Sequence, residues 1–274
     1  MKLFEFDKYF PDEQSCKDEF RKIREKQGIT CKKCGCTQHY WLPNKQQFRC
    51  KKCKTSITLR PGTVIHGSKL PFRYWFIAMH LLTATKHTFS ASELQRQLNH
   101  KRYQPIWELV HKIRSVMGKR DQEYLLHDAV EVDEGFFTTE LPEYEKYSKL
   151  KAGAGSQRKT KVLVMAESKP VTEEDKSKRK KKYNIKKKVG YIKMAVIPNL
   201  KSETIDNEAI NSIDCNAEIT SDATTSHSNF HKIFAKMNAQ VVKPEDIDKV
   251  LPWVHIAIAN SKSLLTDTYH GVQR

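Results

Sequence analysis

Two pairs of cysteines near the N-terminus constrain the fold more than any other feature of the sequence. Cys31 and Cys34 are separated by two residues, as are Cys50 and Cys53, and fifteen residues lie between the pairs. This spacing is typical of a four-cysteine zinc site, because each CxxC turn directs two thiolates at one point and two such turns complete a tetrahedron. The sequence therefore predicts that these four cysteines bind one structural Zn²⁺.

The segment that holds these cysteines, residues 31–60, is predicted to fold as a small zinc ribbon with short strands at 39–42 and 47–49. It carries eight lysines or arginines and no acidic residue. Charge of a single sign favours contact with the phosphates of a nucleic acid. A ribbon that only supports the fold, with solvated lysines, is the alternative. The basic residues are Lys32, Lys33, Lys45, Arg49, Lys51, Lys52, Lys54 and Arg60.

The composition points to a reducing compartment and a polyanionic partner. The seven cysteines are an odd number, and no apolar signal segment opens the chain, which argues against a disulfide framework. No run of apolar residues approaches the length of a transmembrane helix, so no membrane span is expected. Lys plus Arg total 49 and Asp plus Glu total 32, a net charge of +17 that favours a nucleic-acid partner.

Helices are predicted on both sides of the ribbon. Residues 1–30 form a short helical lead-in that starts at Pro11–Glu13, and Cys16 lies on its apolar stripe, which assigns this cysteine to packing. Residues 69–118 contain a helix that begins after Ser90, a turn, and a basic second helix, an arrangement similar to a helix-turn-helix. A plain helical hairpin fits the same pattern.

From residue 127 onward the apolar pattern changes to that of an α/β domain. Lysine or arginine fills nine of the thirteen positions from 176 to 188, so the segment 170–188 is predicted to be a loop, either solvated or facing phosphate. The order of elements predicts a mixed sheet with flanking helices. Strands are expected at 129–137, 161–167, 189–197 and 217–220, and helices at 202–213, 226–238 and 253–265.

Two aspartates in this domain occupy positions that suit a metal site. Asp133 lies within an apolar strand, where an ionised carboxylate is costly unless it binds something, and Asp222 follows the short strand at 217–220. Carboxylates on adjacent strands share hard divalent cations, and two such ions activate an attacking oxygen and stabilise a leaving one at a phosphodiester. Aspartates at a bulge or a sheet edge, without a catalytic role, are the alternative.

Several segments, taken in order, resemble a known family. They are the cysteine ribbon, Leu94-Gln95-Arg96-Gln97-Leu98, Val130-Glu131-Val132-Asp133-Glu134, Thr220-Ser221-Asp222, the segment 253–262 and Tyr269-His270-Gly271. This order is similar to that of bacterial insertion-sequence transposases, which pair a zinc ribbon with a DDE-type, RNase H-like nuclease domain. The resemblance runs from about residue 10 to the end of the chain and implies that residues 127–274 form the catalytic domain.

The resemblance also implies the residues of the active site. Asp133 and Asp222 correspond to the first two metal-binding acids of the family. The third acid lies on a later helix, seven residues before a lysine, and counting back from Lys262 reaches His255. Residues seven apart share a helical face, so His255 is the first choice and Asn260 the second, with Lys262 expected to contact DNA phosphate. Histidine is a weak ligand for Mg²⁺ and a better one for Mn²⁺.

The family implies a function as well. The expected protein is a DNA transposase that binds terminal inverted repeats, cleaves strands with Mg²⁺ or Mn²⁺, and joins them to target DNA as a homodimer in the bacterial cytoplasm, at the nucleoid. Similar transposases continue with another helical segment, which implies that this chain is a truncated or decayed copy. Two other functions fit the same residues. One is a non-catalytic DNA-binding regulator or inactive transposase derivative, and the other is an RNase H-like nuclease acting on branched DNA.

Overall fold

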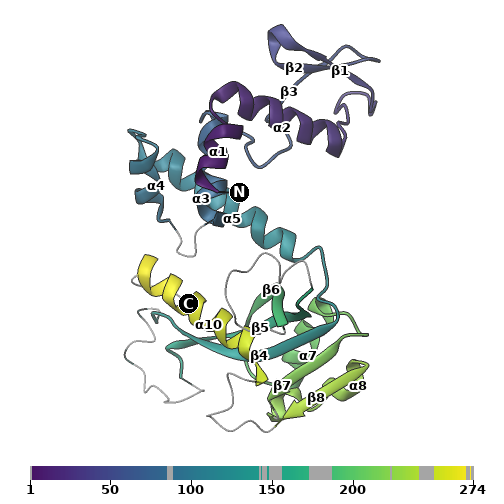
Figure 1. Ribbon diagram of the computed structural model, residues 1–274, viewed down its shortest axis with the longest axis vertical. Helices are drawn as coiled ribbons and strands as arrows, with labels where there is room; N and C mark the ends of the chain where they lie inside the picture. The colour runs from purple at the N-terminus through teal and green to yellow at the C-terminus, as the bar shows by residue number, and fades with distance from the viewer. Residues whose placement is uncertain are drawn as a thin grey trace. The chain divides into compact units, whose positions relative to one another are not determined.

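The computed structural model divides the chain into two compact units, Met1–Lys119 and Arg120–Arg274, and each is described by itself (Figure 1). None of the helices in the described part of the chain has the length and apolar character of a membrane span. The described residues are 2–84, 89–141, 143, 147, 156–172, 187–222, 224–240, 250–269 and 272.

The zinc ribbon of the first unit is a three-stranded antiparallel sheet. The second strand lies in the middle, because His39 pairs with Cys50 on one side and Phe48 pairs with Ile57 on the other. The two predicted strands are confirmed, and the third was not predicted because three residues give too short a pattern. The strands are β1 (His39–Leu42), β2 (Gln47–Cys50) and β3 (Ser56–Thr58).

The helices of the first unit pack around one apolar core that includes Trp75, Leu94 and Ile106. Ser90 caps its helix as predicted, because its Oγ accepts a hydrogen bond from the N–H of Glu93 at 3.0 Å. The last helix ends at Asp121, three residues beyond the predicted segment 69–118. The helices are α1 (Leu3–Tyr9), α2 (Glu13–Gln27), α3 (Phe72–Ala84), α4 (Ala91–Gln97) and α5 (Tyr103–Asp121).

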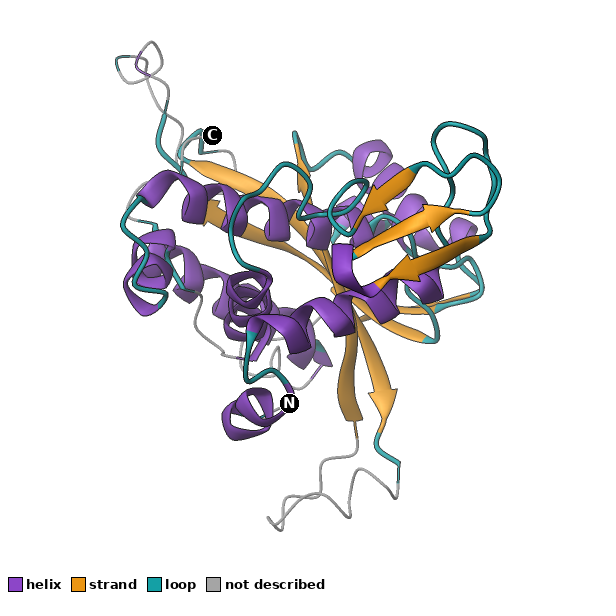
Figure 2. Ribbon diagram, turned by 90° about the horizontal axis from the view of Figure 1, so that it is seen from above, coloured by secondary structure: helices purple, strands orange, loops and turns teal. Residues whose placement is uncertain are grey.

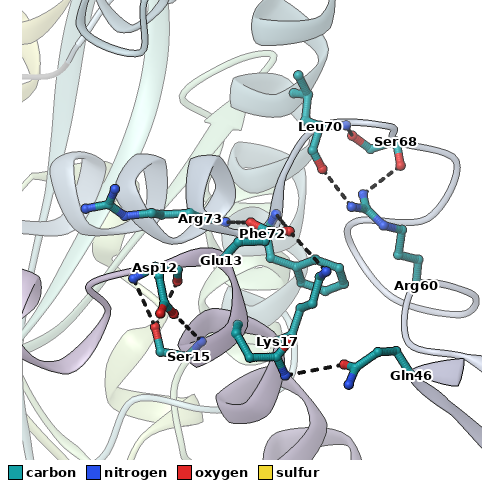
Figure 3. A network of polar contacts seen from close by, with 11 residues as sticks. Asp12, Glu13, Ser15, Lys17, Gln46, Arg60, Ser68, Leu70, Phe72 and Arg73 are labelled. Atoms are coloured by element: carbon teal, nitrogen blue, oxygen red, sulfur yellow. Dashed lines mark hydrogen bonds and ion pairs between the residues drawn. The ribbon is translucent and has the colours of Figure 1, made fainter. Parts of the chain in front are cut away.

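Two charged side chains hold the middle of this unit together (Figure 3). The carboxylate of Glu13, the first residue of α2, accepts hydrogen bonds at 3.0 and 2.9 Å from the first two N–H groups of α3. The guanidinium of Arg60 donates to the carbonyl oxygens of Ser68 at 2.6 Å and Leu70 at 2.7 Å. The guanidinium of Arg60 therefore stabilises the fold, although Arg60 is among the residues that the sequence predicts to contact phosphate.

The second unit is built on a five-stranded mixed sheet with the strand order β6-β5-β4-β7-β8. The central strand β4 pairs antiparallel with β5 and parallel with β7, and β7 pairs parallel with β8. This arrangement is RNase H-like and confirms the predicted α/β class. The strands are β4 (Ala129–Thr138), β5 (Lys159–Pro170), β6 (Lys187–Ile197), β7 (Glu218–Asp222) and β8 (Lys236–Gln240).

The side chains of this sheet alternate between two apolar cores, one on each face. Val130 and Val132 belong to the core that includes residues of α7 and α8, whereas Phe137 and Val164 belong to the core beneath α10. Figure 2 shows the same strands in orange and the helices in purple from above. The helical elements are α7 (Ser202–Ser212), η4 (Thr225–His227), α8 (Phe230–Ile233) and α10 (Pro252–Thr268).

Two predictions for this unit are wrong in part. The expected helix at 226–238 is replaced by η4, α8 and the strand β8, because Phe230 and Phe234 turn into the core and the following residues pair with β7. The expected loop at 170–188 is too long, because Pro170 pairs with Lys187 and both belong to strands. Residues 173–186, the remainder of that loop, lie outside the described residues.

Candidate active site and metal centres

The four predicted zinc ligands of the ribbon lie around one point. The Sγ atoms of Cys31 and Cys53 are 3.5 Å apart, and those of Cys34 and Cys50 are 3.6 Å apart. All four sulfurs lie within 4.8 Å of one another. Thiolates at the corners of a tetrahedron, each about 2.3 Å from Zn²⁺, are about 3.8 Å apart. The donor atoms and their spacing therefore fit a single structural Zn²⁺.

The other three cysteines lie outside this cluster. Cys16 is fully buried in the apolar core, which confirms its predicted packing role. Cys36 directs its Sγ at the carbonyl oxygen of Gln38, 3.7 Å away, and Cys215 is exposed.

The second candidate centre lies where β4 and β7 run side by side. Val132 pairs with Ser221 across these parallel strands, and Asp133 and Asp222 each follow that pair by one residue. Because side chains alternate along a strand, both carboxylates lie on the opposite face from Val132. The side chain of Asp133 is 16% exposed and that of Asp222 is 34% exposed. The two predicted acids are therefore neighbours, and Asp222 is the last residue of its strand rather than the first residue after it.

Helix α10 brings a histidine to this pair. The Nε2 of His255 lies 3.7 Å from Oδ2 of Asp133. Lys262 lies about two helical turns further on, and its Nζ is 6.0 Å from the centre of the Phe137 ring. Asn260 is exposed and lies about 140° around the helix from His255. Three residues were predicted on this helix: His255, Asn260 and Lys262. Among the described contacts, that of His255 reaches a carboxylate, which belongs to Asp133.

Two residues without a predicted role complete the polar cluster. His227 is fully buried, with its Nδ1 3.4 Å from Oδ1 of Asp222 and its Nε2 3.3 Å from Oε1 of Glu134. The N–H of Glu134 donates to Oδ1 of Asp133 at 2.8 Å. The only signals in the sequence were an acid directly after Asp133 and a histidine five residues after Asp222, and neither spacing implies contact.

A buried glutamate positions the helix that carries His255. Glu131 is 3% exposed, and its Oε2 accepts hydrogen bonds from the N–H groups of Trp253 at 2.8 Å and Val254 at 3.3 Å. The residue before α10, Leu251, offers no side-chain cap. A carboxylate at a helix N-terminus satisfies free N–H donors and interacts favourably with the helix dipole. Glu131 thus fixes the start of α10 against the central strand.

The electrostatics of the site favour a bound cation. Burial raises the pKa of Asp133, and the charges of Asp222 and Glu134 raise it further. The contact with His227 lowers the pKa of Asp222. Burial alone lowers the pKa of His227, but its contacts with both carboxylates outweigh burial and raise it to about 9. The negative charges of Asp133, Asp222 and Glu134 repel one another when all three are ionised. A divalent cation beside Asp133 would offset this repulsion.

The comparison with known protein families gives two matches. Residues 125–274 match a model described as an ISXO2-like transposase domain. Residues 11–56 match a transposase zinc-ribbon domain. No curated protein and no solved structure matches the chain. The first match covers more than half of the chain and contains both carboxylates of the candidate site, and the second contains all four zinc ligands.

Proposed function

The chain belongs to the ISXO2-like transposase family and carries a transposase zinc ribbon, and from this premise we propose that it cleaves and joins DNA strands at the terminal inverted repeats of an insertion sequence. One observation carries the proposal. Asp133 and Asp222 occupy matching positions on adjacent parallel strands, with Nε2 of His255 3.7 Å from Asp133. A cluster of this kind on an RNase H-like sheet suits metal-dependent attack on a phosphodiester.

The residues of the site fit Mg²⁺ or Mn²⁺. Asp133 and Asp222 supply the carboxylate oxygens that both ions prefer, and His255 is the proposed third ligand, with Asn260 as the second choice. An imidazole ligand favours Mn²⁺ over Mg²⁺. When bound, the ions supply Lewis acidity at the scissile phosphate and at the attacking oxygen.

Other parts of the chain are proposed to bind DNA. The lysines of the ribbon and the helices α4 and α5 are proposed to bind the terminal repeats, because a surface of one charge sign binds phosphates regardless of base sequence. Lys262 is proposed to hold a phosphate near the site. Two ends of an element must be processed together, so the working form is proposed to be a homodimer on DNA in the bacterial cytoplasm.

The test uses the full chain with zinc and short duplexes that carry the element's terminal repeats. We expect nicking at the repeat ends and joining to a target duplex in Mn²⁺ and, more weakly, in Mg²⁺. Asp133→Ala and Asp222→Ala should abolish both reactions and leave repeat binding intact. Glu203→Gln, which changes an exposed carboxylate on α7, is the matched control and should react like the unaltered protein.

Two results would replace the proposal. Repeat binding without any cleavage, in a protein that Asp133→Ala leaves unchanged, identifies a DNA-binding regulator. Cleavage of four-way junctions in preference to linear repeat ends identifies a nuclease of branched DNA.

A further inference from the structure

His227 is the residue of the candidate site whose role remains to be explained. It ends the short helix η4, five residues after Asp222 along the chain, and its side chain is fully buried. Its ring stacks on Phe230, with the ring centres 4.9 Å apart and the planes 15° apart. The ring is therefore held in one place and one plane by the apolar core.

The two ring nitrogens of His227 contact carboxylates on different strands. Nδ1 lies 3.4 Å from Oδ1 of Asp222 at the end of β7, and Nε2 lies 3.3 Å from Oε1 of Glu134 on β4. Nε2 and this Oε1 are both buried and make no hydrogen bond among the described groups, so their 3.3 Å contact is an ion pair. The histidine thus links the two strands that carry the catalytic acids.

These contacts fit a ring that bridges two carboxylates better than a metal ligand. The ligand atoms of Glu134, Asp222 and His227 lie within 4.8 Å of one another, which is close enough for one cation. However, the two nitrogens of an imidazole point in different directions, and an ion binds only one of them. Here Nε2 faces Glu134, and Nδ1 lies 3.4 Å from both Oδ1 of Asp222 and the hydroxyl of Thr224, so the two nitrogens face carboxylates on different strands.

The Asp222 carboxylate is held at one oxygen. The hydroxyl of Thr224 donates to Oδ1 at 3.1 Å, and this same oxygen faces Nδ1 of His227. Asp222 is the last residue of β7 and pairs with Gln240, so the sheet does not hold the backbone that follows it. Partners that orient a metal-binding carboxylate typically change metal affinity or activity by about 10- to 100-fold when they are removed.

We propose that His227 is a positioning residue, which ties Oδ1 of Asp222 to Glu134 and so presents the other carboxylate oxygen to the cation shared with Asp133. This inference rests on the proposed function, because it assumes that Asp133 and Asp222 bind the catalytic ions. Glu134 is then the anchor of His227 rather than a metal ligand.

The experiment measures Mn²⁺ binding to the full, zinc-loaded chain by the loss of the free-ion electron paramagnetic resonance signal, alongside nicking of terminal repeats at increasing Mn²⁺. His227→Phe keeps the ring that stacks on Phe230 and removes both nitrogens. It should raise the Mn²⁺ concentration for half-saturation, and for half-maximal nicking, by about 10- to 100-fold. His231→Phe, which replaces an exposed histidine of α8, is the matched control and should change neither.

Two further variants separate positioning from packing. The amide of Asn reaches about as far as Nδ1, and the amide of Gln reaches about as far as Nε2. His227→Asn should therefore keep the contact with Asp222 and bind Mn²⁺ more tightly than His227→Gln, which keeps the contact with Glu134. A histidine that only fills the core predicts no such order. The comparison of these two variants also decides the question if His227→Phe does not fold.

The failure of this inference is distinguishable from failure of the proposed function. If the unaltered chain binds Mn²⁺ and Asp133→Asn reduces that binding, but the His227 variants bind as the unaltered chain does, the positioning role is wrong. If Mn²⁺ binding is the same in the unaltered chain and in Asp133→Asn, the proposed catalytic site itself is wrong, and the role of His227 falls with it.

Discussion

The zinc ribbon and the carboxylate site differ in how the protein assembles their ligands. The ribbon takes its four thiolates from two tight turns that are close in sequence, and its apolar side chains include the Trp41–Phe48 pair, with ring centres 4.8 Å apart. The carboxylate site takes Asp133, Asp222 and His255 from two strands and a helix that the cores of the second unit already hold in place.

The two metal sites are therefore expected to contribute differently to the stability of the fold. In the ribbon the ion closes the fold, so its ligands contribute to stability. In the second unit the fold exists before the ion, and the raised pKa of Asp133 means that this carboxylate is held in a site unfavourable to its charge. Loss of a ribbon cysteine should therefore destabilise the fold, whereas loss of the Asp133 charge should stabilise the metal-free second unit.

The largest expected effect is the loss of the ribbon's ion. Binding of a structural Zn²⁺ is worth about 10 kcal/mol or more in small zinc domains, so Cys50→Ser should unfold the ribbon and abolish repeat binding. The thermal transition of the second unit should remain. Calorimetry and limited proteolysis of the full chain measure this, and Cys36→Ser, outside the cluster, should leave both units intact. A Cys50→Ser protein that still binds repeats tightly would contradict the role of the ion as a part of the fold.

The next effect concerns the two aspartates, which should behave alike in catalysis and differently in stability. Asp133→Asn and Asp222→Asn should each reduce nicking by about 1,000-fold or more, a barrier change of about 4 kcal/mol. Without metal, Asp133→Asn should raise the melting temperature at pH 7 because it removes a charge that burial disfavours.

Asp222→Asn should lower the melting temperature, because the contact with His227 favours the charged form of Asp222. The sign follows from linkage. A depressed carboxyl pKa contributes stability above the unfolded value of about 3.9 that is lost as the pH falls through the folded value. A raised carboxyl pKa has the reverse effect. Melting curves of both variants in chelator, from pH 4 to pH 7, test this, and shifts of the same sign would break the comparison.

A smaller effect is expected at the cap of α10. Glu131→Ala leaves the N–H groups of Trp253 and Val254 without their acceptor, and a buried unsatisfied donor costs about 1–3 kcal/mol. The amide oxygen of Glu131→Gln can accept the same two hydrogen bonds as Oε2 of Glu131. The loss of unfolding free energy in this variant should therefore be under about 1 kcal/mol. Urea unfolding of the second unit measures the difference. Equal losses in the two variants would show that the charge, and not the acceptor, supports the helix.

The sequence predicted local features well and long-range contacts poorly. The CxxC turns and the Ser90 cap depend on residues a few positions apart, so their spacing in the chain carries the geometry. The caps supplied by Glu13 and Glu131 join residues 59 and 122 positions apart, and no local pattern indicates them. Arg60 shows the same limit, because its charge suggested a phosphate contact while its donors are bound to carbonyl oxygens.

The candidate active site follows the same rule. Asp133 and Asp222 were predicted from strand position and family resemblance, and the sheet register makes them neighbours. His227 was missed because the segment around it was expected to be a helix from 226 to 238. In the structure the chain turns at η4 instead, and that turn brings the imidazole back to Asp222.

The smallest expected effect tests how DNA affinity is divided between the two regions. Lys262 shares a flank of α10 with His255, and it lines a cavity of about 660 Å³ together with Lys159 and Phe137. If Lys262 holds one phosphate, Lys262→Ala should weaken repeat binding by less than about tenfold and reduce the salt slope of log affinity by about one. Lys262→Arg should bind normally, and Lys201→Ala, at the exposed start of α7, should change neither quantity. Fluorescence anisotropy at several salt concentrations measures both quantities.

The ribbon keeps seven lysines and arginines besides Arg60, so unfolding the ribbon should weaken repeat binding far more than Lys262→Ala does. A Lys262→Ala protein that loses as much affinity as Cys50→Ser would place the main DNA-binding surface on the catalytic unit, and it would reverse the comparison drawn between the two regions.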